Sequence, residues 1–246
     1  MYDIGMMMNW LLFGVGLIGP GLIDALFGSE DENGESQDEN VGETTILGSE
    51  DDVFEGTAED DTIYGMTGDD FLLGAAGDDY VEGNVGNDTI FGGLGDDVIS
   101  GGGGTDTLYG GEGNDLLFSD RADDEAEWTR GDTEMLFGGS GDDILFFGGD
   151  DTAEGGSGAD TFGMIHTEEG PSQIVDFDPI LDDAILYVDG LDEATEEPTV
   201  RIENDIAEET TTVYLDDDPV IVFGGLFSSE EIDLTVADTN TIDFAR

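Results

Sequence analysis

An aspartate recurs through the middle of the chain, each time near the end of a glycine-rich run. Eleven copies of a nine-residue phrase lie between Leu47 and Gly163, and the most regular are GNVGNDTIF, GGLGDDVIS, GGGGTDTLY and GGEGNDLLF, consecutive from Gly83. Carboxylates and peptide carbonyls are hard oxygen ligands that suit Ca²⁺, whereas Mg²⁺ demands a stricter octahedral geometry. We therefore predict Ca²⁺ ligands at the sixth position of each copy: Asp52, Asp61, Asp70, Asp79, Asp88, Asp97, Asp106, Asp115, Asp143, Asp151 and Asp160.

Each copy predicts a turn followed by a strand. Glycines at the first, second and fourth positions allow a positive φ and a close approach of the backbone to a ligand. The next three residues predict a short strand whose middle side chain points inward. These inward residues are all apolar: Phe54, Ile63, Leu72, Val81, Ile90, Ile99, Leu108, Leu117, Leu145, Ala153 and Phe162. Two copies then form one coil, and turns eighteen residues apart stack into two rows.

The stretch from Ser119 to Phe137 tests this register, because it is ten residues longer than one repeat. A later copy, from Phe147 to Glu154, is one residue short. Allowing for both, one row contains Asp52, Asp70, Asp88, Asp106, Glu134 and Asp151, and the other contains Asp61, Asp79, Asp97, Asp115, Asp143 and Asp160. The alternation survives, so residues 119–133 are predicted to form an acidic loop outside an unbroken stack. A contact site at Trp128 is the alternative interpretation of this loop.

Repulsion within the rows predicts that the fold needs cations. Stacked coils lie about 4.8 Å apart, so neighbouring carboxylates repel by about 3 kcal/mol at an effective dielectric constant of about 20. The ten neighbour contacts in the two rows together give a repulsion on the order of 30 kcal/mol. This repulsion exceeds the about 5–15 kcal/mol by which a domain is usually stable. The whole chain has a formal charge of −59, with 63 acidic residues and four basic ones. This charge excludes nucleic acid and anionic membrane surfaces as ordinary electrostatic partners.

The nonapeptide resembles the RTX, or haemolysin-type, calcium-binding repeats of proteins exported by type I secretion. The resemblance implies an all-β, right-handed parallel β-roll with about eight to ten Ca²⁺ ions. Each ion would lie between turns one coil apart, held by sixth-position carboxylates and backbone carbonyls of both. Some of these ion positions depart from the motif: those that touch Glu134, those that touch the shortened repeat, and those in the first two copies. In the first two copies, Glu50 and Glu59 stand in place of the fourth glycine.

The chain before the repeats divides into an apolar segment, residues 1–28, and an acidic flexible linker, residues 29–46. Residues 4–27 fit a signal peptide, a membrane helix or a helix docked on the roll. Docking is favoured, because Gly and Pro interrupt the segment and no Lys or Arg flanks it. Its predicted target is an outward apolar stripe: Phe71, Leu73, Phe91, Tyr109, Met135 and Phe137. Membrane contact through residues 4–27 stays open as the alternative.

After the roll, residues 47–163, the pattern changes and residues 164–246 predict a β-rich cap. Strands are expected at 173–177, 184–188, 199–203, 211–215, 220–223 and 232–236. The phrases IVDFDPILDDAILYVDGL and VYLDDDPVIVFGGL resemble the C-terminal segment of serralysin-like proteins. That resemblance implies a cap with an uncleaved signal for the type I secretion machinery.

No catalytic constellation is apparent. The single histidine, His166, lies in HTEEG rather than in a zinc-binding HExxH helix, and no GxSxG elbow or cysteine occurs. We therefore expect a non-enzymatic, extracellular calcium-binding protein whose folding is switched by calcium. The alternative is a calcium-dependent adhesive or surface-matrix module that contacts a partner through the apolar stripe. The sequence leaves the oligomeric state open.

Overall fold

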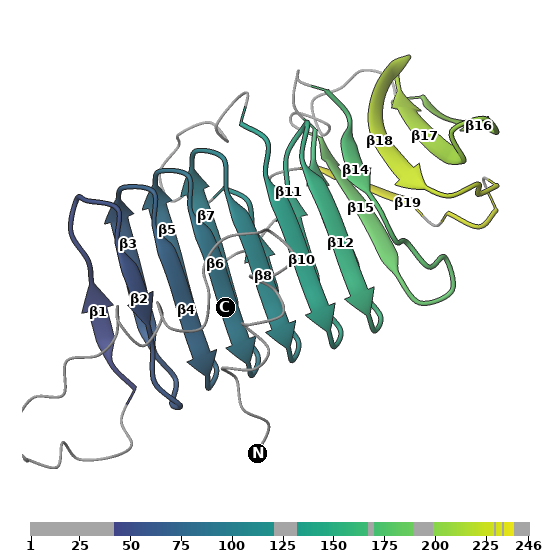
Figure 1. Cartoon of the computed structure of the whole chain (residues 1–246). Coiled ribbons are helices and arrows are strands. Elements are labelled where there is room, and N and C mark those ends of the chain that lie inside the picture. Colours follow the sequence, from purple (N-terminus) through teal and green to yellow (C-terminus); the bar gives the residue numbers. More distant parts are fainter. Residues whose placement is uncertain are drawn as a thin grey trace, which may run out of the picture. The chain divides into compact units, whose positions relative to one another are not determined.

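Two long sheets run through the chain, and successive strands alternate between them as far as residue 188 (Figure 1). The computed structural model describes residues 42–120, 132–166, 170–188, 199–228, 230–232 and 234–238. The predicted helix within residues 1–28 and most of the predicted linker lie outside these residues. In the described part, no helix is long and apolar enough to cross a membrane.

The first sheet contains nine strands, in spatial order β1 (Thr44–Ile46), β3 (Thr62–Thr67), β5 (Tyr80–Val85), β7 (Val98–Gly103), β9 (Leu116–Phe118), β11 (Ile144–Phe147), β13 (Thr161–Ile165), β15 (Asp183–Val188) and β19 (Leu234–Asp238). The second contains ten: β16 (Val200–Asp205), β17 (Thr210–Leu215), β18 (Asp218–Gly224), β14 (Ser172–Ile174), β12 (Thr152–Ser157), β10 (Met135–Ser140), β8 (Thr107–Glu112), β6 (Thr89–Leu94), β4 (Phe71–Ala76) and β2 (Val53–Glu55). The predicted all-β parallel roll is confirmed. β1 lies within the range predicted as linker, because Thr44 pairs with Thr62 in the first sheet.

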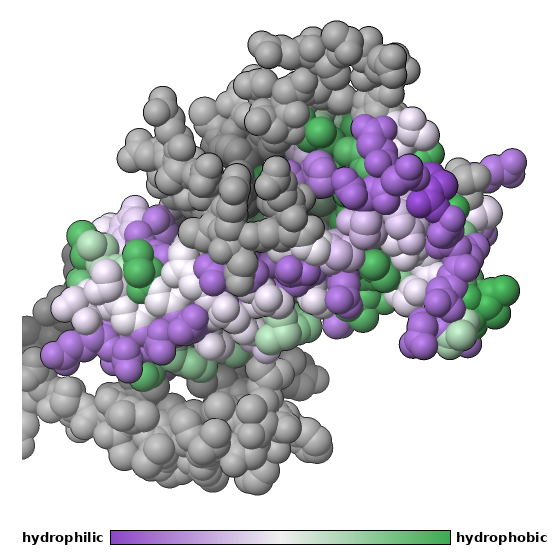
Figure 2. Space-filling model, turned by 90° about the horizontal axis from the view of Figure 1, so that it is seen from above, coloured by the Kyte–Doolittle hydropathy of each residue, from purple (hydrophilic) through white to green (hydrophobic). Residues whose placement is uncertain are grey.

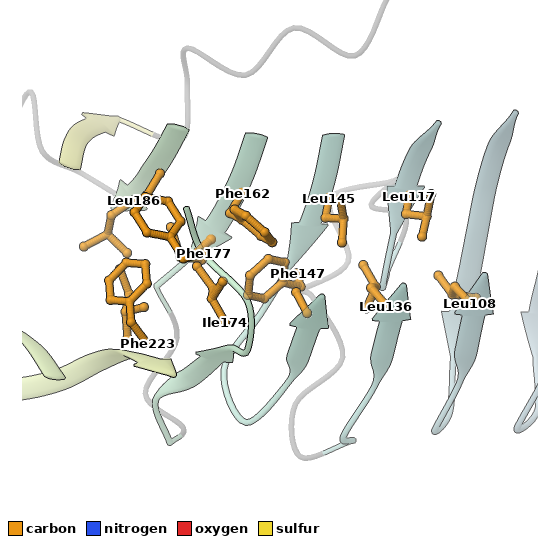
Figure 3. Close-up of a cluster of buried hydrophobic side chains, with 14 of the residues drawn as sticks. Leu108, Leu117, Leu136, Leu145, Phe147, Phe162, Ile174, Phe177, Leu186 and Phe223 are labelled. Carbon is orange, nitrogen blue, oxygen red and sulfur yellow. The ribbon is translucent and has the colours of Figure 1, made fainter. Parts of the chain in front are cut away.

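Parallel pairing at eighteen-residue steps builds the core. Thr62 pairs with Tyr80, and Phe71 pairs with Thr89. The inward residues predicted from the repeat are fully buried from Ile63 to Phe162, while Phe54 at the first coil is partly buried. Figure 3 shows part of this core, from Leu108 and Leu117 onward: side chains from the two sheets face one another, and aromatic rings join them at Phe147, Phe162, Phe177 and Phe223.

Most strands of the repeat region are longer than the three residues that we expected. β4 to β8, for example, each contain six residues, because each strand continues into the following repeat, whose second and third positions also pair with neighbouring coils. The second of these positions adopts a positive φ even where the residue is not glycine, as at Met66 (81°), Ala75 (91°) and Asn84 (76°). The pattern of the sequence underestimated the strands because glycine is a poor strand former by propensity.

The stack is continuous across the irregular stretch. Met135 of β10 pairs with Thr107 of β8, and Ile144 of β11 pairs with Leu116 of β9. These registers confirm the predicted alternation of the two rows. Residues 121–131 of the predicted loop, including Trp128, lie outside the described residues.

The expected C-terminal strands are present with shifted ends, and several of them continue the two sheets. β14 pairs with β12, and β15 pairs with β13, both in parallel. Only β16–β17 and β17–β18 are antiparallel among the described pairs. They form a meander at one end of the second sheet, opposite β2 (Figure 1).

The outer face of the second sheet carries a row of aromatic rings. Centroids lie 5.4 Å apart for Phe71 and Phe91, 4.5 Å for Phe91 and Tyr109, and 4.8 Å for Tyr109 and Phe137. The last two pairs are stacked nearly parallel. These rings are half-buried and belong to the predicted stripe. In a view turned by 90° from Figure 1, hydrophilic residues form several purple patches along the roll (Figure 2).

Candidate metal centre

The turns bring the predicted ligands into two buried rows. Each predicted aspartate closes a turn and directly precedes a strand. Asp52 is half-buried, while the other ten predicted aspartates expose 3% of their surface or less. Glu134, with 3% exposure, takes the sixth position in the row that passes the irregular stretch. Burial of so many acids requires partners for their oxygens.

In ten of the eleven predicted aspartates, all but Asp52, one oxygen accepts a hydrogen bond from the backbone of the preceding coil. Asp79 Oδ1 accepts a hydrogen bond from the Asp61 amide at 2.7 Å, and Asp97 Oδ1 accepts one from the Asp79 amide at 2.8 Å. The same bond links Asp52 to Asp70 in the other row, at 2.8 Å. These bonds fix the carboxylates in register with the coils.

The second oxygen has no hydrogen-bond donor in eight of these acids. It is Oδ2 in seven aspartates and Oε1 in Glu134, and all eight oxygens are buried: Asp70, Asp79, Asp88, Asp97, Asp106, Asp115, Glu134 and Asp143. An unsatisfied buried group of this kind costs about 1–3 kcal/mol, and more when it is charged. Eight such oxygens, repeated from coil to coil, therefore indicate that a cation completes these turns.

In each regular turn, the carboxylate oxygen without a donor faces a backbone carbonyl oxygen of the next coil. The space between the two oxygens stays open because the first residue of the turn is glycine. A Cβ on Gly92 would overlap Asp97 Oδ2 and would lie 2.8 Å from the carbonyl oxygen of Gly110, one coil further on. A Cβ on Gly101 would likewise meet Asp106 Oδ2 and the carbonyl oxygen of Ser119. Two oxygens that converge without a hydrogen between them form a cradle for a cation. The donor set, carboxylate plus carbonyl, fits Ca²⁺.

Burial and like charge act against ionisation of these acids in the absence of a cation. Burial, reinforced by neighbouring carboxylates, raises the pKa of Asp79, Asp88 and Asp115 to about 6. It raises the pKa of Asp106 and Asp143 to about 7, and that of Asp97 to about 8. The pKa of Glu134 is also raised by its burial and by the adjacent Asp151. A cation at the vacant oxygens would reverse this effect.

Three predicted ligands differ from these eight acids, because an amide of their own turn satisfies their second oxygen. Asp52 Oδ2 accepts from the Gly48 amide at 3.1 Å, and Asp151 Oδ2 accepts from the Gly148 amide at 2.8 Å. Asp61 Oδ2 accepts from both the amide and the hydroxyl of Thr57, at 2.6 and 3.0 Å. These turns are closed by protein atoms alone.

The sequence interpretation missed one member of the second row. Asp182 lies one coil beyond Asp160, and its Oδ1 accepts the Asp160 amide at 3.0 Å. Its Oδ2 accepts the Asp178 amide at 2.7 Å. The preceding residues, FDPILD, contain no glycine, so the turn signal is absent. One signal remained: in every repeat the acid is followed two residues later by an inward apolar residue, and Asp182 and Ala184 have this spacing.

No cluster of three or more Asp, Glu or His side chains forms a metal site within the described residues. Each cradle instead combines one vacant carboxylate oxygen with backbone carbonyls. Residues 47–81, 82–117 and 147–162 match the family model of the RTX calcium-binding nonapeptide repeat (4 copies). The chain carries RTX calcium-binding repeats. Such repeats bind Ca²⁺, and the roll provides suitable oxygens in the same turns.

Comparison with solved structures gives a match to the solution structure of the AlgE6R3 subunit from the Azotobacter vinelandii mannuronan C5-epimerase. The identity is 18%, and the match covers 85% of this RTX chain and 91% of the other, with a TM-score of 0.22. A comparison with curated protein sequences found no match.

Proposed function

We propose that this is a secreted calcium-binding protein whose β-roll folds outside the cell on binding about eight to ten Ca²⁺ ions between stacked turns. The observation that carries the proposal is the set of eight buried carboxylate oxygens without a donor. The proposed ligands are the eleven sixth-position aspartates, from Asp52 to Asp160, together with facing carbonyls. Export would use the type I secretion machinery, as the RTX resemblance implies.

The energetic basis of the proposed switch is the cost of burying unneutralised carboxylates. A pKa raised from 3.8 to about 6, as for Asp79, corresponds to about 3 kcal/mol for each ionised group. With little free Ca²⁺ in the cytosol, these costs favour an unfolded, exportable chain. At the calcium affinities typical of extracellular modules, about 10⁻⁴–10⁻³ M, each ion adds stability to the folded state alone.

The proposed role is structural rather than catalytic. In each regular turn of the roll, one carboxylate oxygen accepts a backbone amide and the other faces a cation cradle. These carboxylates are therefore unsuited to acid–base chemistry on a substrate. Ten bound ions would still leave a net charge of about −39, which favours solubility.

A calcium titration of the full chain tests this proposal. Far-ultraviolet circular dichroism should show sheet forming cooperatively with Ca²⁺ and disappearing after EDTA is added, whereas Mg²⁺ at the same concentrations should have little effect. Equilibrium dialysis should then count the bound ions. A chain that holds its sheet after complete chelation, or that takes up no calcium, would contradict the proposal.

A calcium-dependent adhesive module is the second candidate, because the outer row of Phe91, Tyr109 and Phe137 is only half-buried. Exposed apolar rows of this kind often contact partners. Sedimentation velocity with saturating calcium distinguishes the candidates: self-association that Tyr109→Ser abolishes supports adhesion, and a monomer at all concentrations speaks against a self-adhesive row.

A further inference from the structure

Two consecutive aspartates of one row show that a turn of the roll has two forms. Asp61 and Asp79 lie one coil apart, both are buried, and the Oδ1 of each accepts an amide of the preceding coil. They differ only at Oδ2. In Asp61 that oxygen accepts the Thr57 amide of its own turn, whereas in Asp79 it has no donor. We call these the closed and the open turn.

The second residue of the turn distinguishes the two forms. In the open turn of Asp79 this residue is Ala75, with a φ of 91°, whereas Thr57 in the closed turn is not in the left-handed region. The open turns of the other six regular repeats also have a positive φ at this position: Met66, Asn84, Gly93, Gly102, Gly111 and Gly139. The closed turns of Asp52 and Asp182, with Gly48 and Asp178 at this position, do not.

The direction of the second-position amide explains this difference. In the open turn of Asp106, the Gly102 amide donates to the Ser119 carbonyl of the next coil, at 3.1 Å. It is therefore withdrawn from Asp106, whose Oδ2 stays without a donor. In a closed turn the amide points into its own turn and occupies the same carboxylate oxygen. One N–H thus serves either the neighbouring coil or its own acid.

We propose that this amide and Ca²⁺ are alternative partners for the same oxygen, so that open turns bind an ion through it and closed turns do not. The proposal rests on the proposed calcium-binding function and limits it. The closed turns lie at the ends of the rows: Asp52 and Asp61 at one end, Asp151 and Asp182 at the other. Between these ends, seven described turns are open by both criteria, and each binds one ion by this mode: those of Asp70, Asp79, Asp88, Asp97, Asp106, Asp115 and Asp143.

The position of the closed turns agrees with this assignment. At the first coil, β1 and β2 stop after three residues, and the second-position residues Gly48 and Thr57 have no strand partner. Their amides are therefore free to turn inward. At the end of a row, an ion would have ligands from one side only. The amide of the same turn occupies the carboxylate oxygen there instead, so no such ion is needed. The roll is terminated at both ends by hydrogen bonds in place of metal.

The test compares one substitution at two neighbouring positions of the same row. Asn is close in size and shape to Asp and keeps an Oδ1 acceptor, so Asp61→Asn and Asp79→Asn each change only the second oxygen. Equilibrium dialysis of the full chain against saturating Ca²⁺, followed by metal analysis, should give the wild-type number for Asp61→Asn and one ion fewer for Asp79→Asn. Asp70→Asn, which carries an open turn in the other row, should also lose one ion and replaces Asp79→Asn if that variant does not fold.

Loss of an ion from Asp61→Asn, or none from folded Asp79→Asn and Asp70→Asn, would overturn the assignment of the two turn forms. Those results differ from failure of the proposed function, in which the wild-type chain itself would bind no calcium. Circular dichroism on each sample confirms that the ions are counted on folded protein.

Discussion

Acidification should induce the roll to fold without calcium. The perturbation is a change from pH 7.5 to pH 5 in metal-free buffer. The buried carboxylates have folded-state pKa values of about 6 to 8, well above the 3.8 of an ordinary aspartate. Because the folded state binds protons more tightly than the unfolded chain, these groups stabilise it fully below about pH 4. That stabilisation is lost as the pH rises through 6 to 8.

The magnitude follows from the same pKa values. Between pH 7.5 and pH 5, a group with a folded pKa of about 6, such as Asp79 or Asp88, contributes about 1 kcal/mol. Asp97, at about 8, contributes about 3 kcal/mol. The six groups with such values together reach on the order of 10 kcal/mol, comparable to the stability of a whole domain. At pH 5 the exposed acids stay ionised, which keeps the chain soluble.

Far-ultraviolet circular dichroism and sedimentation velocity, recorded across this range without metal, should show a compact, sheet-rich monomer appearing below about pH 6. Asp97→Asn removes the largest contribution and should flatten the pH dependence of the unfolding free energy by about 3 kcal/mol. Asp96→Asn is the matched control, because Asp96 is exposed in the same turn, and it should leave that dependence unchanged. A metal-free chain that stays unfolded at pH 5 would refute the reasoning.

Three further predictions concern the cradle, the core and the outer face. Gly92→Ala places a Cβ against Asp97 Oδ2, so equilibrium dialysis should find one bound ion fewer; an unchanged count would contradict the cradle. Leu108→Ala empties a fully buried site and should lower the free energy of unfolding in saturating calcium by about 2–5 kcal/mol, measured with urea. Gly163→Ala places a methyl group against the ring of Phe146 and should cost about 1–3 kcal/mol by the same assay, with a changed near-ultraviolet dichroism.

The repeat allowed the core and the registers to be predicted, because both follow from spacing alone. Leu108 and Leu136 face the same interior although twenty-eight residues separate them, and the count of positions through the irregular stretch was sufficient to align them. The same count predicted the place of Glu134 in its row, where its side chain is buried.

Features that depend on backbone conformation could not be read from the repeat. Nothing in the residue types shows that the Thr57 amide turns toward Asp61 while the Ala75 amide turns away from Asp79. That choice goes with the φ of the second-position residue, which the residue type alone does not fix. Asp182 was missed for a related reason. It belongs to the row because its Oδ1 accepts the Asp160 amide, and its turn contains no glycine by which the sequence would indicate it.

The passage from Ser119 to Glu134 has a practical consequence for protein engineering. β10 pairs in register with β8, and β11 with β9, although the sequence between β9 and β10 is ten residues longer than one repeat. A solenoid whose units contact only their neighbours tolerates such an excursion, because no distant part must adjust. The sequence between β9 and β10 is thus a natural insertion point, where a foreign peptide or a small domain could be grafted into the chain without shifting the register of the coils.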